Sequence, residues 1–237
     1  MHWDFALILL FLGIAVPLLG RRRVRQLMQM PATTKEDRLT LYASTIAFQW
    51  IASGLVLWRA AAHGISAAQL GLGVPRPQTT LALAIGLVAL VLLNQIVGLK
   101  KLATQPAANQ GLVPQLAQKL FPQDQVERLA FFGLVVTVAV CEEIIYRGFV
   151  QQVIQNLSAG SVYAAVLGSA IFFAFAHLYQ GKRGLISTFT VGILFSAATA
   201  ATLSLIPSIA AHFVADFTAG ILAPKYLAQA NRSATSS

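Results

Sequence analysis

The chain has 237 residues, of which 57% are hydrophobic and only 11% are charged, whereas soluble domains carry about 25% charged residues. This composition excludes a soluble domain of any size and predicts an all-α, polytopic membrane protein with about seven transmembrane helices. The net charge of +9 does not indicate a nucleic-acid partner, because the basic residues flank apolar segments, as in membrane proteins. The single cysteine, Cys141, excludes an internal disulfide and a multi-cysteine metal cluster.

The N-terminal membrane region, residues 1–128, is predicted to contain three spans and some surface segments. The spans are expected at residues 3–19, 39–62 and 80–99. The helix that contains span two is expected to begin near Thr34, where acidic residues follow a helix-capping side chain. A short surface helix is expected at 113–120. The first apolar run precedes its arginine cluster, which begins at Arg21, so we expect a retained span and not a cleaved signal peptide.

Residues 129–224 are predicted to form a four-span core that contains the active site, followed by a flexible cytoplasmic tail at 225–237. Its spans are expected at 129–154 and 162–178, with two more between 185 and 223 that are separated near 204–207. With seven spans, the loop Lys and Arg residues lie almost entirely on one side, and only Arg59 and Arg76 lie on the other. We therefore expect a plasma-membrane protein with its N-terminus outside and its C-terminus in the cytoplasm.

Three charged residues, Glu142, Glu143 and Arg147, lie inside the apolar helix of span four. A charge at mid-bilayer costs about 2.5–3.5 kcal/mol on insertion scales, so such residues are functional candidates. Glu143 and Arg147 are four residues apart and can pair on one helix face. Glu142 points about 100° away and has no partner in its own helix. The alternative interpretation is a structural polar clamp between helices.

Two histidines and a further acid also fall within predicted spans. His212 and Asp216 are four apart on span seven, so Asp216 can hold the imidazole or line the site itself. Each buried polar group needs a partner, and convergence on one pocket satisfies them all. His177 lies near the cytoplasmic end of span five, whereas Glu142 is deeper by residue count. The site therefore requires that the loop 180–184 dips into the membrane or that span four begins as a surface helix.

A carboxylate with two imidazoles is suited to activating water. Glu142 is the candidate general base, and a histidine can share the water or stabilise an oxyanion. Glu142, His177 and His212 are also candidate Zn²⁺ ligands, although the His-Glu-x-x-His pattern of soluble zinc proteases is absent. The sequence leaves open whether the cofactor is Zn²⁺ or none.

Three motifs, Glu142-Glu143-x-x-x-Arg147, Phe173-x-x-x-His177 and His212-x-x-x-Asp216, resemble the CPBP family (CAAX proteases and bacteriocin-processing enzymes, the Abi family). The resemblance implies an intramembrane endopeptidase that cleaves a membrane-associated or lipidated protein or peptide, by a metal-dependent or a glutamate-dependent mechanism.

The roles implied by this resemblance follow the motifs. Glu142 and His177 activate water, His212 and Asp216 stabilise the oxyanion or bind a metal, and Glu143 with Arg147 supports the site. The prenyl endopeptidases of the family tend to have Asn at the last position. Asp216 cannot donate a hydrogen bond unless it is protonated, which favours a role in orienting His212.

Two other classes of protein bury charges in this way. An ion-coupled transporter also carries carboxylates at mid-membrane, but it is expected to show internal repeats or paired broken helices, and the sequence has neither. A catalytically silent membrane protein of the bacteriocin-immunity type keeps the fold without the reaction, and the intact motif set argues against it.

The orientation can be tested by labelling engineered cysteines in a Cys141→Ala background. We expect Ser66→Cys to react with a membrane-impermeant reagent from outside the cell and Gln180→Cys not to react, because the basic residues place residue 180 on the cytoplasmic side. Labelling of residue 180 from outside would overturn the predicted topology.

Overall fold

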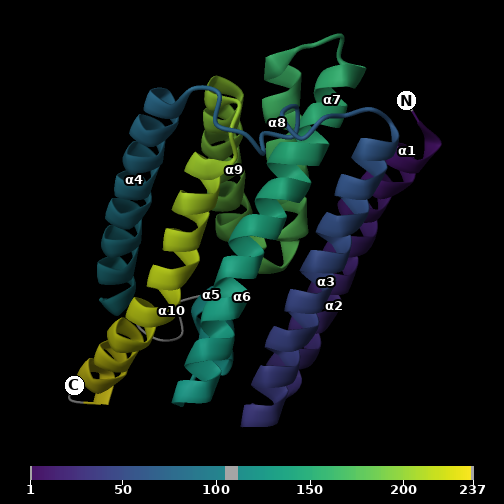
Figure 1. Cartoon of the computed structure of the whole chain (residues 1–237). Helices are drawn as coiled ribbons and strands as arrows, with labels where there is room; N and C mark the ends of the chain where they lie inside the picture. Colours follow the sequence, from purple (N-terminus) through teal and green to yellow (C-terminus); the bar gives the residue numbers. More distant parts are fainter. Residues whose placement is uncertain (1, 105–111, 236–237) are drawn as a thin grey trace.

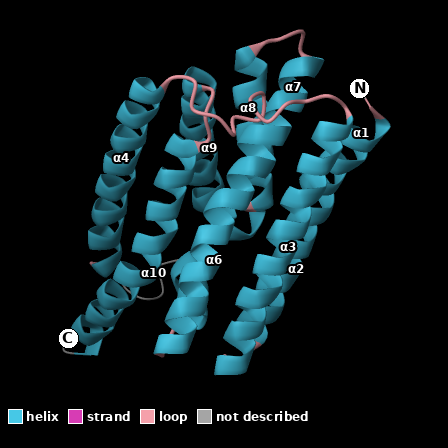
Figure 2. Ribbon diagram, in the orientation of Figure 1, coloured by secondary structure: helices cyan, strands magenta, loops and turns pink. Residues whose placement is uncertain are grey.

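The computed structural model describes residues 2–104 and 112–235, and the regular elements in these ranges are helices (Figures 1 and 2). In chain order the α-helices are α1 (Trp3–Leu10), α2 (Val16–Gln29), α3 (Lys35–Ala62), α4 (Pro77–Ala103), α5 (Leu112–Leu120), α6 (Gln125–Glu143), α7 (Gln151–Leu157), α8 (Val162–Ala176), α9 (Gly181–Thr202) and α10 (Ile206–Thr235). π-helical turns at Phe11–Ala15 and Ile144–Val150 join α1 to α2 and α6 to α7, and a 3₁₀ turn at Leu178–Gln180 precedes α9.

The predicted spans correspond to α1–α2, α3, α4, α6–α7, α8, α9 and α10. In the part of the chain that the structure describes, five helices are long and apolar enough to cross a membrane, and α8 is a shorter apolar helix. These helices confirm an all-α, polytopic integral membrane protein. The short surface helix is present as α5, and α10 continues to Thr235 through most of the segment assigned to a tail.

The first helix extends further than the predicted span. It continues through the arginine cluster to Gln29, because Arg, Gln, Leu and Met all favour helix and only the apolar part has to lie in hydrocarbon. The chain then turns and starts α3 at the predicted place. Thr34 and Asp37 form a capping box, in which each side chain accepts a hydrogen bond from the other residue's backbone N–H.

The helix α6 lies in the middle of the bundle. Figure 1 shows α4, α10, α6 and α3 across the front, with α1–α2 behind α3 and α8–α9 behind α6 and α10. The main packing pairs are α4 with α10, α8 with α9, α3 with α6, and α6 with α10. Polar groups on α6 can therefore be reached from α3 on one side and from α10 on the other.

The helices α3 and α6 run parallel and share a nearly constant register. Four pairs of side-chain contacts join them, and the partners lie 89, 93, 87 and 88 residues apart along the chain. Such a constant offset indicates two helices that stay aligned over several turns. The contact nearest their N-termini is an ion pair between Arg38 and Glu127, 3.0 and 2.8 Å long, with side chains 3% and 1% exposed.

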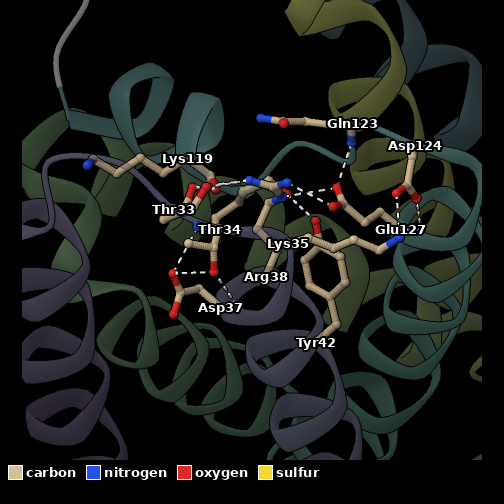
Figure 3. A network of polar contacts seen from close by, with 11 residues as sticks. Thr33, Thr34, Lys35, Asp37, Arg38, Tyr42, Lys119, Gln123, Asp124 and Glu127 are labelled. Carbon is tan, nitrogen blue, oxygen red and sulfur yellow. Dashed lines mark hydrogen bonds and ion pairs between the residues drawn. The ribbon is translucent and has the colours of Figure 1, made fainter.

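Further polar contacts gather around this pair (Figure 3). The backbone N–H of Gln123 donates to Glu127 at 2.7 Å, and Arg38 donates to the carbonyl of Thr33 at 2.8 Å. The hydroxyl of Tyr42 donates to the carbonyl of Leu120 at the end of α5. We call this network the α3–α6 clamp, and it ties the starts of both helices to the loops beside them.

In the α3–α6 clamp, the buried Arg38–Glu127 ion pair is expected to contribute more to the free energy of unfolding than an exposed ion pair beside it. Glu127→Gln leaves the buried Arg38 without its charge partner, and breaking one side of a buried pair costs about 3–5 kcal/mol. Unfolding can be followed with a thiol-reactive dye, because Cys141 is buried and becomes reactive on unfolding. We expect Glu127→Gln to lower the melting temperature in detergent substantially.

The matched control is Lys35→Ala, which removes the neighbouring 2.6 Å ion pair between Lys35 and Asp124. The side chains of these two residues are 48% and 43% exposed. Water already solvates these charges, so this variant should melt close to the wild type. If both variants melt alike, the buried pair does not stabilise the clamp.

Candidate functional site

The two glutamates lie at the point where α6 changes into a π-helical turn. Glu143 is the last residue of α6, and the seven residues that follow, Ile144–Val150, are all buried. π-Turns within α-helices occur frequently at functional sites. Gly148 allows a close approach here, because a Cβ at this position would lie 3.1 Å from the carbonyl oxygen of Leu70.

One oxygen of Glu143 accepts hydrogen bonds from two partners. Its Oε1 accepts a 2.9 Å hydrogen bond from Nη1 of Arg147 and a 2.8 Å bond from Nδ1 of His212. The side chains of Glu143 and Arg147 have no exposed surface. The predicted pairing of these two residues is confirmed, and the same carboxylate also joins α6 to α10.

Arg147 is enclosed by aromatic rings. Its guanidinium carbon lies 4.0 Å from the ring centre of Phe173 on α8 and 5.4 Å from that of Phe195 on α9. A guanidinium over an aromatic face is stabilised by the ring quadrupole, the more so when it is desolvated. Within the described residues, its Nε and Nη2 have no hydrogen-bond partner, so the ring faces supply much of its compensation.

Glu142 points to a different set of groups. Its Oε1 accepts a 2.9 Å hydrogen bond from Nε2 of Gln49 on α3, and its Oε2 is a buried acceptor without a partner in the part of the protein described. This Oε2 lies 4.0 Å from Nε2 of His212. Oδ2 of Asp216 lies 3.6 Å from the same nitrogen. His212 therefore contacts Glu143 through Nδ1 and faces Glu142 and Asp216 with Nε2.

His177 ends α8 and is half-buried. Its Nδ1 lies 2.8 Å from the carbonyl oxygen of Phe173, and because a carbonyl only accepts, Nδ1 carries the hydrogen. Among the described contacts, no hydrogen bond or ion pair joins His177 to Glu142, His212 or Asp216. Its ring packs on Phe173, 4.7 Å between centres, and Phe173 in turn contacts His212 at 5.9 Å.

The depth of His177 follows from the antiparallel hairpin of α7 and α8. Glu142 lies fifteen residues before the end of α7 (142 to 157), and His177 lies fifteen residues after the start of α8 (162 to 177). Ser169 donates a 2.8 Å hydrogen bond to the carbonyl of Tyr146. Tyr146 follows Glu142 by four residues, whereas Ser169 precedes His177 by eight, so this contact places His177 further from the α7–α8 turn than Glu142. In Figure 1 the turn from α8 to α9 lies partway along α6.

The three candidate Zn²⁺ ligands, Glu142, His177 and His212, do not form a ligand set in this arrangement. No group of three or more His, Cys, Asp or Glu side chains within the described ranges is placed to hold a metal ion. Nδ1 of His212 is bonded to Glu143, and Nδ1 of His177 is bonded to a backbone carbonyl. A histidine whose one ring N–H is held by a carboxylate or a carbonyl can still bind a metal through its other nitrogen, so these two contacts leave Nε2 of each ring as the possible metal ligand.

Gln49 is the contact that the sequence interpretation missed. It belongs to a stripe of polar residues four apart on α3, Thr45, Gln49 and Ser53, of which the last two are buried. Residues at this spacing share a helix face, so the stripe was a readable sign of a polar contact with another helix. Ser53 on the same face also contacts α6, where it donates a 3.3 Å hydrogen bond to the carbonyl of Cys141.

Comparison with known proteins agrees with the motifs. Residues 124–218 match the profile of the Rce1-like family, the type II CAAX prenyl endopeptidases. No curated protein and no solved structure gives a significant match to the chain. The matched segment contains Glu142, Glu143 and Arg147 together with His177, His212 and Asp216, and it supports a CAAX-type intramembrane endopeptidase. Residues 124–218 of this integral membrane protein are therefore similar to the Rce1-like type II CAAX prenyl endopeptidases.

Proposed function

We propose that the protein hydrolyses a peptide bond of a lipidated or otherwise membrane-associated protein, with Glu142 and His177 activating the water. The observation that carries this proposal is the meeting of Glu142, His212 and Asp216 within 4.0 Å contacts inside the helix bundle. These residues lie in the segment that matches a peptidase family. Two acids and an imidazole at one point of an apolar bundle can supply both a base and an oxyanion donor.

Glu142 is the proposed general base. One of its oxygens is held by Gln49 and the other, Oε2, has no partner among the described residues, so Oε2 is available to take a proton from water. Because Nδ1–H of His177 is bonded to the Phe173 carbonyl, the neutral ring presents the lone pair of Nε2 and can accept a second hydrogen bond from that water. The water oxygen then attacks the peptide carbonyl carbon.

His212 is the proposed oxyanion donor. The carboxylates of Glu142, Glu143 and Asp216 surround its ring, and we assign it the imidazolium form, in which both nitrogens donate. Nδ1–H stays on Glu143, and Nε2–H is free to stabilise the negative oxygen of the tetrahedral intermediate. When the intermediate collapses, Glu142 returns its proton to the leaving amine. Arg147 neutralises Glu143 throughout.

The replacement Glu142→Gln tests the base. The amide keeps the shape of the side chain and removes its charge, so we expect a folded protein whose turnover falls by about 10²–10⁴. His177→Ala should lose a similar factor, and the double variant should resemble either single variant, because both groups act on one water.

Two measurements check this expectation. Proteomics of membrane-protein termini, in cells with wild type or Glu142→Gln at equal levels, identifies the cleavage sites. Purified protein in liposomes then gives rates on a peptide that spans the strongest site. Equal turnover by the two proteins would reject the peptidase and favour the transporter.

A chelator tests the metal question on the same peptide. Since the described side chains form no three-ligand set, we expect a strong chelator to leave the rate unchanged. Loss of activity with the chelator and recovery with Zn²⁺ would show that the side chains rearrange around a metal.

A further inference from the structure

The N-terminal membrane region contacts the candidate catalytic carboxylate through Gln49. Gln49 on α3 lies outside the segment that matches the peptidase family, residues 124–218. It is 9% exposed, and its Nε2 donates a 2.9 Å hydrogen bond to Oε1 of Glu142. A hydrogen bond to an ionised carboxylate is short and roughly twice as strong as a neutral one, so this contact can fix the orientation of Glu142.

The remaining oxygens of these two side chains are both unsatisfied. Oε1 of Gln49 and Oε2 of Glu142 are buried acceptors with no hydrogen-bond partner in the described residues. A buried acceptor without a donor costs about 1–3 kcal/mol. Water molecules that donate one O–H to each acceptor can satisfy them, and the water at Oε2 of Glu142 keeps its second O–H for Nε2 of His177.

We propose that Gln49 is a positioning residue for the hydrolytic water. Its N–H fixes the carboxylate of Glu142 so that Oε2 faces His212 and can accept one O–H of the water that Glu142 deprotonates. This inference rests on the proposed function, because it assigns a role around the same base. It also makes α3, and with it the N-terminal membrane region, a part of the site.

The register of α3 and α6 gives this contact its support. Trp50 donates a 3.2 Å hydrogen bond to Thr137 beside it, and the Arg38–Glu127 pair aligns the same two helices at their start. Thr137 lies more than one turn from Glu142, so the Trp50 contact aligns the helices without touching the proposed water. It supplies a matched control for a role that is only structural.

The decisive variant is Gln49→Met, which keeps the length of the side chain and removes both its donor and its acceptor. A misplacement of about 1 Å can cost about 10²-fold in rate. We therefore expect kcat on the liposome peptide assay to fall by about 10- to 100-fold with KM little changed. Trp50→Phe should retain the wild-type kcat. In the Glu142→Gln background, Gln49→Met should cause no further loss, because the base that it positions is gone.

A spectroscopic measurement tests the contact between Gln49 and Glu142 without relying on turnover. The infrared carboxylate stretch of Glu142, obtained from the difference between wild type and Glu142→Gln, should shift in Gln49→Met and stay in place in Trp50→Phe. The positioning role is overturned if kcat of Gln49→Met stays within about twofold of wild type, if Trp50→Phe loses as much activity, or if the losses multiply in the double variant. If Glu142→Gln turns over normally, the peptidase proposal fails instead, and the infrared shift then reports the contact alone.

Discussion

Glu143 is a carboxylate with no exposed side-chain surface, and burying such a charge is tolerated only when cationic groups and hydrogen bonds compensate it. Arg147 and His212 both contact its Oε1. Arg147 is itself buried, and the ring faces of Phe173 on α8 and Phe195 on α9 help to stabilise its charge. One buried charge thus links α6, α8, α9 and α10. The orientation of His212, and hence the face that it presents to Glu142, depends on this linkage.

The second support of the site comes from outside the family segment. The helix α3 contacts α6 from Arg38 to Ser53, and these contacts keep the two helices in one register. The segment 124–218 contains all the acidic and imidazole groups of the proposed reaction, while the amide that contacts Glu142 belongs to α3. The N-terminal region therefore serves as more than a membrane anchor, and a division of the chain at residue 128 separates parts that contact each other closely.

Hydropathy and spacing were enough to predict the helical membrane fold and the pairing of Glu143 with Arg147, because both depend on local sequence periods. The partners in contacts between helices could not be predicted from the sequence. The hydrogen bond from His212 to Glu143 and that from Gln49 to Glu142 join residues 69 and 93 positions apart, and no local pattern names the partner. The π-helical turn after Glu143 was also not predicted, because it adjusts a helix to its packing environment.

The depth of His177 shows a related limit. Counting from the nearest charged loop suggested that His177 and Glu142 lie at different levels. That count took no account of the pairing of α7 with α8, in which Ser169 contacts Tyr146. Which end of a helix serves as the reference depends on its neighbour, and this is a property of the packed hairpin.

The length of α8 has a consequence for the surrounding lipid. Its 15 residues extend only about 22 Å, whereas the hydrocarbon core of a bilayer is about 30 Å thick. A protein face shorter than the hydrocarbon produces hydrophobic mismatch, which the membrane relieves by local thinning. Beside α8 and the turn that follows it, such thinning draws headgroups and water toward His177. For the hydrolysis proposed above, it would bring water and the anchor of a lipidated substrate closer to the site.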